Sequence, residues 1–527
     1  MIPRRLLIPA LVALLAALAT APAHASDGQL SVMMDDNNLI YSGDQVRDQT
    51  LTRMKQLGVD EVRVTVLWSV IAHNAQKGKA RRRTFHRRGA ANPKAYPKLN
   101  WDRYDRLARA CATLRIGCYF DVTGPGPTWG HERVPRKYRK DRATWKPKAS
   151  QFKLFVEAVG KRYSGKYKDE NDNHFTLPRV NFWALWNEPN QGGWLTPQFV
   201  RGRPYSPMLF RKLFRAGQKG LVATGHGGDV ILLGETAPLG WTTHTDRSAM
   251  APLTFMKALF CVNDAGQRAS GLGCSDFTHN GPLQATAWAH HPYSKTSSPF
   301  TPLSDNQAIT DDKSAITMFN VATLTGFLDK VAQNTGRVAA ALPVALTELG
   351  WETNPPDPFA GISPDKQAEY VNDADFLAWL NPRVIANTQF LLRDVPPDRS
   401  HTPGGKAYWH TYQSGLFQAN GTPKPAASAY RLPFVPYPLG RDENGAMTEA
   451  IWGQLRFRPK GTPDTVQVLF QPAGAADFAP LGAPLTVNDQ RNFFTGTVPL
   501  SGPGQLKLQW SGNEAPFQAE SRAVPVG

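Results

Sequence analysis

Short runs rich in apolar, β-branched and aromatic residues alternate with longer amphipathic segments over most of the chain. Runs of this length and composition favour β-strands, and the segments between them are long enough for helices. Eight such runs cover residues 30–36, 59–68, 116–124, 179–189, 229–238, 285–293, 342–351 and 384–392. Strand–helix alternation repeated eight times predicts an α/β fold, a closed parallel (β/α)8 TIM barrel.

Two of the intervening segments carry clear helical patterns. In residues 101–114, apolar side chains recur every three or four positions from Trp101 to Leu114, which defines one buried face. In residues 363–380, Ser363 is the predicted N-cap and Pro364 lies in the first turn. Both segments are therefore predicted to be helices.

The helical pattern stops after the proline-rich segment 431–440, and short alternating runs separated by Gly, Pro and Asn follow. This pattern is typical of a small β-sandwich. We predict a barrel over residues 26–436 and a β-sandwich accessory domain over 437–527. The sandwich either caps the barrel or binds carbohydrate. Sugar stacking would require exposed aromatic rings such as Trp452 or Trp510, although a Trp in a small sandwich more often lies in the core.

Residues 1–25 have the pattern of a secretory signal peptide. Arg4 and Arg5 precede an apolar run, and Ala23-His24-Ala25 is a small-residue cleavage site. No later apolar run approaches the length of a membrane span. We therefore expect a secreted protein, extracellular or periplasmic, with no membrane span, and a monomer.

The chain is basic, with a formal net charge of +17, or +15 once the two arginines of the leader are removed. Residues 77–88 and 132–148 are the most basic segments, and both follow predicted strands, so both are expected at the active-site face. They favour an anionic glycan as partner, or they are solvated loops. Nucleic acid is not an expected partner, because no recognition motif is present and the protein is exported.

The four cysteines fit an exported protein. Cys261 and Cys274 flank a glycine-rich loop, and we expect a disulfide between them. Cys111 and Cys118 are either bridged or small buried apolar residues. No Cys/His cluster has the spacing of a zinc site, so neither a metal nor a cofactor is predicted.

Two predicted strands end in a glutamate beside a tryptophan. The fourth ends in Trp186-Asn187-Glu188-Pro189, and the seventh contains Glu348 followed by Trp351. In a barrel, reactive side chains come from the C-terminal ends of the strands. Two carboxyl groups in one cleft are what the cleavage of a glycosidic bond requires.

These motifs, with the sixth-strand sequence from Trp288 to Tyr293 between them, resemble the clan A glycoside hydrolases, (β/α)8 enzymes that include cellulases, mannanases and xylosidases. The resemblance covers residues 29–435, and parts are similar to family 5 or family 39 members. It implies that Glu348 is the nucleophile and Glu188 the acid/base of a retaining mechanism. In that mechanism Glu348 begins ionised and Glu188 protonated, and Glu188 later acts as a base towards water.

The resemblance also assigns supporting residues. Asn187 is expected to hold the sugar 2-hydroxyl, and Tyr293 to hydrogen-bond the nucleophile. His291 lies two residues before Tyr293 and is predicted to point into the same cleft. Arg63 alternates with Val62 and Val64, so it is expected to face into the barrel and to pair with Glu348; the alternative is a surface salt bridge.

Further substrate-binding candidates lie at other strand ends. Asp35, Trp68 and Trp129 are candidates for sugar subsites, since flat aromatic rings stack on pyranose rings. Glu235, at the end of the fifth strand, is a third carboxylate, a candidate for substrate contact and the rival for a catalytic role. Many clan members have a tryptophan at the end of the eighth strand, whereas this chain has residues 387–390, Asn-Thr-Gln-Phe.

The sequence therefore predicts a secreted retaining glycoside hydrolase that cleaves O-glycosidic bonds of a poly- or oligosaccharide. Two alternatives remain open: a non-catalytic glycan-binding or cell-envelope protein that keeps the barrel, and a transglycosylase that uses the same site. The pattern specifies neither the sugar and its linkage nor whether attack is internal or at chain ends.

Overall fold

The structure is a computed structural model, and it describes residues 28–302, 313–441, 447–511 and 520–527. The predicted signal peptide, residues 1–25, lies outside the described residues. In the described part of the chain, no helix is both long enough and apolar enough to cross a membrane.

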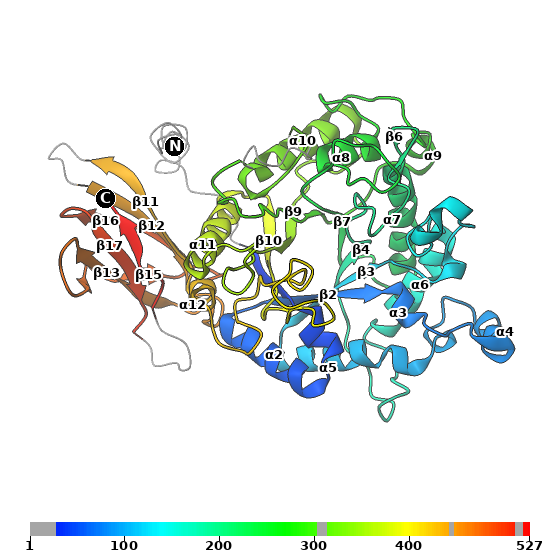
Figure 1. The fold of residues 1–527 in the computed structure, drawn as a ribbon, viewed down its shortest axis with the longest axis horizontal. Coiled ribbons are helices and arrows are strands. Elements are labelled where there is room, and N and C mark those ends of the chain that lie inside the picture. The colour runs from blue at the N-terminus through cyan, green and yellow to red at the C-terminus, as the bar shows by residue number, and fades with distance from the viewer. Residues whose placement is uncertain (1–27, 303–312, 442–446, 512–519) are drawn as a thin grey trace. The chain divides into compact units, whose positions relative to one another are not determined.

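The predicted barrel is confirmed, because eight parallel strands close on themselves in the order β1, β2, β3, β4, β7, β8, β9, β10. Figure 1 labels six of them, β2, β3, β4, β7, β9 and β10. Each lies within one of the eight predicted runs. Their bounds are β1 Leu30–Met34, β2 Glu61–Leu67, β3 Gly117–Thr123, β4 Phe182–Leu185, β7 Val230–Thr236, β8 Ala287–His290, β9 Val344–Leu349 and β10 Val384–Phe390. Closure comes from β1, which pairs in parallel with both β2 and β10.

The interior of the barrel is filled by small and aromatic side chains. One buried cluster takes residues from seven of the eight strands: Val32, Tyr119, Phe182, Ala184, Leu232, Ala287, Ala289, Ala345 and Ala386. Alternate residues of a strand face the same side, so Tyr119 and Asp121 share a face of β3. In register with β3, Arg63 lies opposite Tyr119 and Thr65 opposite Asp121. Arg63 therefore faces the interior, as its alternation with two valines predicts.

Helices and short ribbons connect the strands. They are η2 Asn37–Tyr41, α2 Asp44–Leu57, α3 Trp68–Ile71, α4 Gly78–Arg88, η3 Pro93–Ala95, η4 Lys98–Asn100, α5 Asp102–Leu114, η5 Thr128–Gly130, η6 Arg136–Asp141, α6 Ala149–Arg162, β5 Phe199–Val200, β6 Arg203–Pro204, α7 Ser206–Val222, α8 Pro252–Phe260, α9 Asp276–Asn280, η7 Met318–Asn320 and α10 Val321–Thr335. The predicted helix over 101–114 is α5, and it buries Tyr104, Leu107, Ala108 and Cys111.

The described chain forms two compact units. One contains residues 30–351 and 383–397, and so the whole barrel; the other contains residues 352–382 and 398–527. The second unit holds α11 Pro364–Leu380, α12 Pro425–Arg431 and the strands β11 Phe434–Arg441, β12 Met447–Gln454, β13 Asp464–Pro472, β14 Ala479–Pro480, β15 Leu485–Val487, β16 Phe493–Leu500, β17 Gly504–Gln509 and β18 Val524–Val526. The side chain of Ser363 caps α11 as predicted, accepting a hydrogen bond from the amide of Lys366.

The strands of the second unit form the predicted small sandwich. One sheet has the order β11, β12, β16, and the other has β14, β13, β17, β18, with β15 also paired to β13. Trp510 belongs to its core, and Trp452 is buried as well, on the face of β12 opposite to the core residue Ile451. Helix α11 covers this other face of the sheet, since the ring centroids of Phe376 and Trp379 lie 5.4 and 5.9 Å from that of Trp452. Helix α11 therefore belongs to the compact unit of the sandwich, while the domain boundary at residue 436 stays a prediction.

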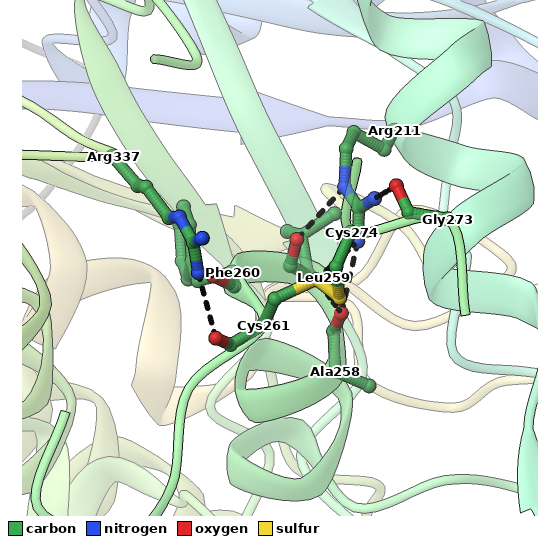
Figure 2. Close-up of a disulfide and its surroundings, with 8 residues drawn as sticks. All are labelled: Arg211, Ala258, Leu259, Phe260, Cys261, Gly273, Cys274 and Arg337. Atoms are coloured by element: carbon green, nitrogen blue, oxygen red, sulfur yellow. Dashed lines mark hydrogen bonds between the residues drawn. A yellow bond between two sulfur atoms is a disulfide. The ribbon is translucent and has the colours of Figure 1, made fainter. Parts of the chain in front are cut away.

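The predicted disulfide between Cys261 and Cys274 is present (Figure 2). Next to it, the Arg211 guanidinium donates hydrogen bonds to the carbonyl oxygens of Ala258, Leu259 and Gly273 at 2.7–3.0 Å. Cys111 and Cys118 are buried and unbridged, so the second of the two predicted alternatives holds for them.

Candidate active site

Polar side chains from six barrel strands meet at the C-terminal end of the barrel, around the guanidinium of Arg63. Its Nη1 donates to Glu348 Oε1 at 2.7 Å, and its Nη2 donates to Glu235 Oε2 at 2.7 Å and to Asn187 Oδ1 at 2.8 Å. Asp121 lies 3.2 Å from the same nitrogen. Arg63 is fully buried, so these contacts form in a medium that screens charge weakly.

Glu348 is held through both of its oxygens. Arg63 binds Oε1, and the Tyr293 hydroxyl donates to Oε2 at 3.1 Å. About 10% of the Glu348 side chain is exposed, against 21% for Glu188. Glu188 is therefore half-buried, and Glu348 is about nine-tenths buried.

His291 bridges Glu188 and Glu235. Its Nδ1 donates to Glu188 Oε1 at 3.0 Å and its Nε2 to Glu235 Oε2 at 2.8 Å, while Glu348 Oε2 lies 3.6 Å from Nδ1. Burial by itself would lower the pKa of His291, but the negative charge of Glu348 and the hydrogen bonds to Glu188 and Glu235 raise it to about 10. His291 is therefore a cation at neutral pH.

Glu235 is the anion at the base of the cluster. Its carboxylate is fully buried, and the Tyr119 hydroxyl donates to its second oxygen. Burial opposes its ionisation, yet the positive charges of Arg63 and His291 bring the pKa of Glu235 down to about 2. Its oxygens are occupied by protein groups, so its position suits orientation of other side chains better than contact with a substrate.

Unusual backbone conformations position the glutamates. Trp186, Glu188 and Glu235 all have positive φ, at 80°, 37° and 51°. Non-glycine residues in this region store strain, and such residues gather at functional sites. The turn after β4 is tied to its neighbours, because the amide of Glu188 donates to the carbonyl of Glu235 at 2.9 Å and that of Asn187 to Thr123 Oγ1 at 2.8 Å.

The glutamates Glu188 and Glu348 face each other closely. One carboxylate oxygen of each, together with a ring nitrogen of His291, form a set in which all atoms lie within 4.8 Å of one another. A set of this kind can bind a metal ion only if the imidazole offers a lone pair. Both ring nitrogens of His291 already contact carboxylates, Nδ1 that of Glu188 and Nε2 that of Glu235, so a metal ion bound here would have to displace one of these contacts.

Seven of the predicted site residues thus come together: Arg63, Asn187, Glu188, Glu235, His291, Tyr293 and Glu348. Asp35 and Trp68 do not join them. Asp35 is fully buried and accepts hydrogen bonds from Asn38 and from the amide of Arg393. Trp68 is fully buried against Phe155, with ring centroids 5.6 Å apart. For these two residues the predicted subsite role has no support in this geometry.

Trp129 is half-buried. Its ring lies edge-on to that of Trp68, with centroids 5.8 Å apart, and its centroid lies 5.1 Å from that of Phe85. Its subsite role stays a prediction. At the end of the eighth strand, where the sequence lacks a tryptophan, the half-buried ring of Phe390 lies edge-on to Tyr293 with centroids 6.0 Å apart.

Sequence analysis missed three polar residues of this region. Asp121 and Tyr119 line the inner face of β3, and alternation along that strand would have found them. Burial raises the pKa of Asp121 well above its usual range. Asp36, directly after β1, accepts hydrogen bonds from the amide of Thr65, and burial raises its pKa to about 6.

No family model matches this sequence, and neither does any curated protein. Among solved structures, the chain is similar to a family 39 glycoside hydrolase from Bacteroides cellulosilyticus WH2, with 13% identity over 91% of this chain and 82% of that one and a TM-score of 0.47. It is also similar to a glucosidase from Croceicoccus marinus, with 12% identity, 90% and 93% coverage and a TM-score of 0.47.

A GH5_18 protein from Streptomyces cattleya in complex with GlcNAc has 16% identity, 77% and 79% coverage and a TM-score of 0.42. Scores below 0.5 at such identities say nothing about what this chain does. The barrel is established by the chain's own strand topology.

Proposed function

We propose that this protein is a retaining glycoside hydrolase. One observation carries the proposal: the half-buried Glu188 and the buried Glu348 lie close together at the C-terminal end of the barrel, with an oxygen of each within 4.8 Å of the other. Retaining enzymes hold their two carboxyl groups about 5–5.5 Å apart, whereas inverting enzymes need roughly 6.5–9.5 Å to admit a water molecule. The close approach favours retention.

Glu348 is the proposed nucleophile. Its two oxygens are oriented by a buried cation, Arg63, and by the Tyr293 hydroxyl. In the first step a Glu348 oxygen attacks the anomeric carbon, and Glu188 gives its proton to the leaving oxygen. The products are a glycosyl ester on Glu348 and a free alcohol.

The charges of the cluster balance in both steps. Among the groups in direct contact, Arg63 and His291 are cations, and Glu235 and Glu348 are the matching carboxylates. Asp121 also contacts Arg63, but burial raises the pKa of its carboxyl well above the usual range and so favours its neutral form. A protonated Glu188 then keeps the cluster neutral. When Glu348 becomes an ester it loses its charge, and a Glu188 carboxylate restores neutrality beside the His291 cation. Glu188 then takes a proton from the water that hydrolyses the ester.

Asn187 and Phe390 are the proposed contacts to the sugar. The Asn187 side-chain oxygen accepts from Arg63, which directs its amide group as the donor for a sugar 2-hydroxyl. Phe390 offers an apolar ring next to the nucleophile at the strand end that lacks a tryptophan.

We also propose that the protein is exported and acts on an anionic glycan. The leader pattern of residues 1–25 and the disulfide both fit an oxidising compartment. Helix α4 exposes Lys79, Arg81, Arg82, Arg83, Arg87 and Arg88, and the loop after β3 exposes Arg133, Arg136, Lys137, Arg139 and Lys140. The buried ring of Phe85 in α4 contacts Trp129 of that loop, so the two basic segments adjoin.

The test is release of reducing sugar from neutral and acidic polysaccharides, including plant and bacterial-envelope polymers. Wild type should be active on at least one, and Glu348→Gln should lose at least about 10³-fold of that activity because no nucleophile remains. Asp365→Asn, at an exposed carboxylate in the first turn of α11, should stay fully active. Equal activity of wild type and Glu348→Gln would refute the mechanism.

If neither wild type nor the variants released sugar from a glycan that wild type binds, the result would favour the non-catalytic alternative. Analysis of the products then separates hydrolysis from transglycosylation. Longer oligosaccharides would appear when a sugar hydroxyl replaces water as the acceptor.

A further inference from the structure

Three potential metal ligands gather in the segment that follows the barrel, outside the cluster around Arg63. Asp398 Oδ2 lies 3.8 Å from His401 Nε2 and 3.6 Å from His410 Nε2. All three ligand atoms lie within 4.8 Å of one another, and the centroids of the two imidazole rings are 5.6 Å apart. The three side chains thus converge on one point.

Backbone groups of the segment hydrogen-bond one polar atom of Asp398 and one of His410, and they leave the other polar atom of each side chain available to a metal ion. The amide of Ser400 donates to Asp398 Oδ1 at 2.9 Å, which leaves Oδ2 on the side of the histidines. The Nδ1 of His410 donates to the carbonyl of Ala407, so the lone pair of this ring is on Nε2. A ligating histidine characteristically donates its other ring N–H to a carbonyl or carboxylate, which fixes the tautomer.

The segment is closed by its own backbone. The amide of Asp398 donates to the carbonyl of Tyr408 at 2.9 Å, and the amide of His401 donates to the carbonyl of Asp398 at 3.2 Å. Residues near 398 and near 408 are therefore already side by side. Binding a metal ion here requires little further ordering of the chain.

We propose that Asp398, His401 and His410 bind a zinc ion. With bond lengths of about 2.0–2.2 Å, ligand atoms at the corners of a tetrahedron lie roughly 3.3–3.6 Å apart. The observed 3.6 and 3.8 Å need only a small contraction. Two imidazoles and one carboxylate select zinc over magnesium or calcium, which prefer oxygen ligands.

The site has a direct path for the ion. The side chains of Asp398, His401 and His410 are 32%, 48% and 55% exposed, so the ion can enter from solvent and a water molecule can take the fourth position. The zinc ion cross-links residues 398 to 410 across the segment. This proposal is independent of the glycosidase assignment, since the two sets share no residue.

The test is a metal titration of the full chain, made without a histidine tag and dialysed free of metal. Cobalt(II) should bind with one equivalent and give the visible bands of tetrahedral coordination, and zinc should displace it. Even an outer-shell partner is worth roughly 10–100-fold in metal affinity, so His401→Ala, His410→Ala and Asp398→Asn should each weaken binding at least tenfold. Magnesium should not compete.

The matched control is His279→Ala. His279 is exposed, and its Nδ1 also hydrogen-bonds a backbone carbonyl, that of Ser275 at 2.8 Å. This variant should bind cobalt as wild type does. Absence of the tetrahedral bands in wild type, unchanged affinity in the three ligand variants, or an equal loss in His279→Ala would each overturn the proposal. Circular dichroism of every variant verifies that a lost site is not a lost fold.

Discussion

At the residue scale, the cluster around Arg63 concentrates charge that a protein interior seldom contains. Its two cations are Arg63 and His291, and its two carboxylates are those of Glu235 and Glu348. All four side chains are at least nine-tenths buried, and each contacts a partner of opposite charge. Removing one partner from such a set leaves an uncompensated buried charge, which typically costs about 3–5 kcal/mol of stability. The side chains of the site are therefore interdependent, and conservative substitutions are the informative ones.

The first prediction at this scale concerns Glu188. In Glu188→Ala, substrates with poor leaving groups should slow by about 10²–10⁴-fold, because no group protonates the departing oxygen. Aryl glycosides with an acidic phenol should react far better, since a phenolate leaves without a proton. Steady-state rates over a series of phenols of graded acidity measure this dependence. A uniform loss across the series would argue against the acid role.

The second prediction assigns Glu235 a positioning role through His291. Glu235→Gln removes a negative charge that raises the pKa of His291, so this pKa should fall from about 10. The alkaline limb of the pH–rate profile should move to lower pH, while activity near pH 6 stays within about tenfold of wild type, because His291 is still protonated there.

The control for Glu235 is Tyr119→Phe, which removes a hydrogen bond to Glu235 but keeps its charge. This variant should retain the alkaline limb of wild type. If Glu235→Gln has an unaltered profile, Glu235 does not act through His291.

At the scale of elements, the strands could be predicted from the local sequence pattern. The residues at the ends of the strands form the site. All eight predicted runs contain a barrel strand, because buried parallel strands are continuous apolar runs. Burial of Asp35 and Trp68 could not be predicted in this way. It depends on which helices and loops cover a strand end, and these come from distant parts of the chain.

The disulfide offers a prediction at this scale. Replacing both cysteines in Cys261→Ser/Cys274→Ser reopens a loop of 13 residues, and a cross-link over a loop of this size contributes about 3 kcal/mol. Denaturant unfolding followed by circular dichroism should show this loss. A reductant should destabilise wild type by a similar amount and leave the double variant unchanged. If the reductant lowered the stability of wild type and of the double variant equally, its effect would not come from the Cys261–Cys274 disulfide, and the prediction would be wrong.

At the scale of the whole molecule, the net charge of +17 is unevenly distributed. Helix α4 contributes six exposed basic side chains and no acidic residue. A charged surface of this kind raises the local concentration of an oppositely charged polymer, and salt weakens the effect because the Debye length is only about 8 Å at physiological ionic strength.

Arg82→Glu/Arg83→Glu should therefore weaken binding of an acidic polysaccharide severalfold at low salt, and the difference from wild type should shrink as salt is added. Binding is measured by co-sedimentation or calorimetry with the polymer. The matched control is Lys212→Glu/Lys219→Glu on α7, which changes the net charge by the same amount at two exposed lysines outside α4. Equal losses in the two double variants would show that only total charge matters.

The amino-acid sequence was enough to predict the barrel, the sandwich, the disulfide and the gathering of Arg63, Asn187, Glu188, His291, Tyr293 and Glu348. The barrel and the sandwich follow from local periodicity, and the disulfide follows from two cysteines that flank a glycine-rich loop. The two glutamates and Arg63 follow from strand alternation and from the common edge at which parallel strands end. Asn187 and Tyr293 were assigned through the resemblance to the clan A glycoside hydrolases. Three features became visible only in the folded chain: Glu235 lies buried between Arg63 and His291, α11 packs with the sandwich, and Asp398, His401 and His410 converge. Each of these depends on which distant side chains share a small volume, and neither spacing nor composition encodes that distance.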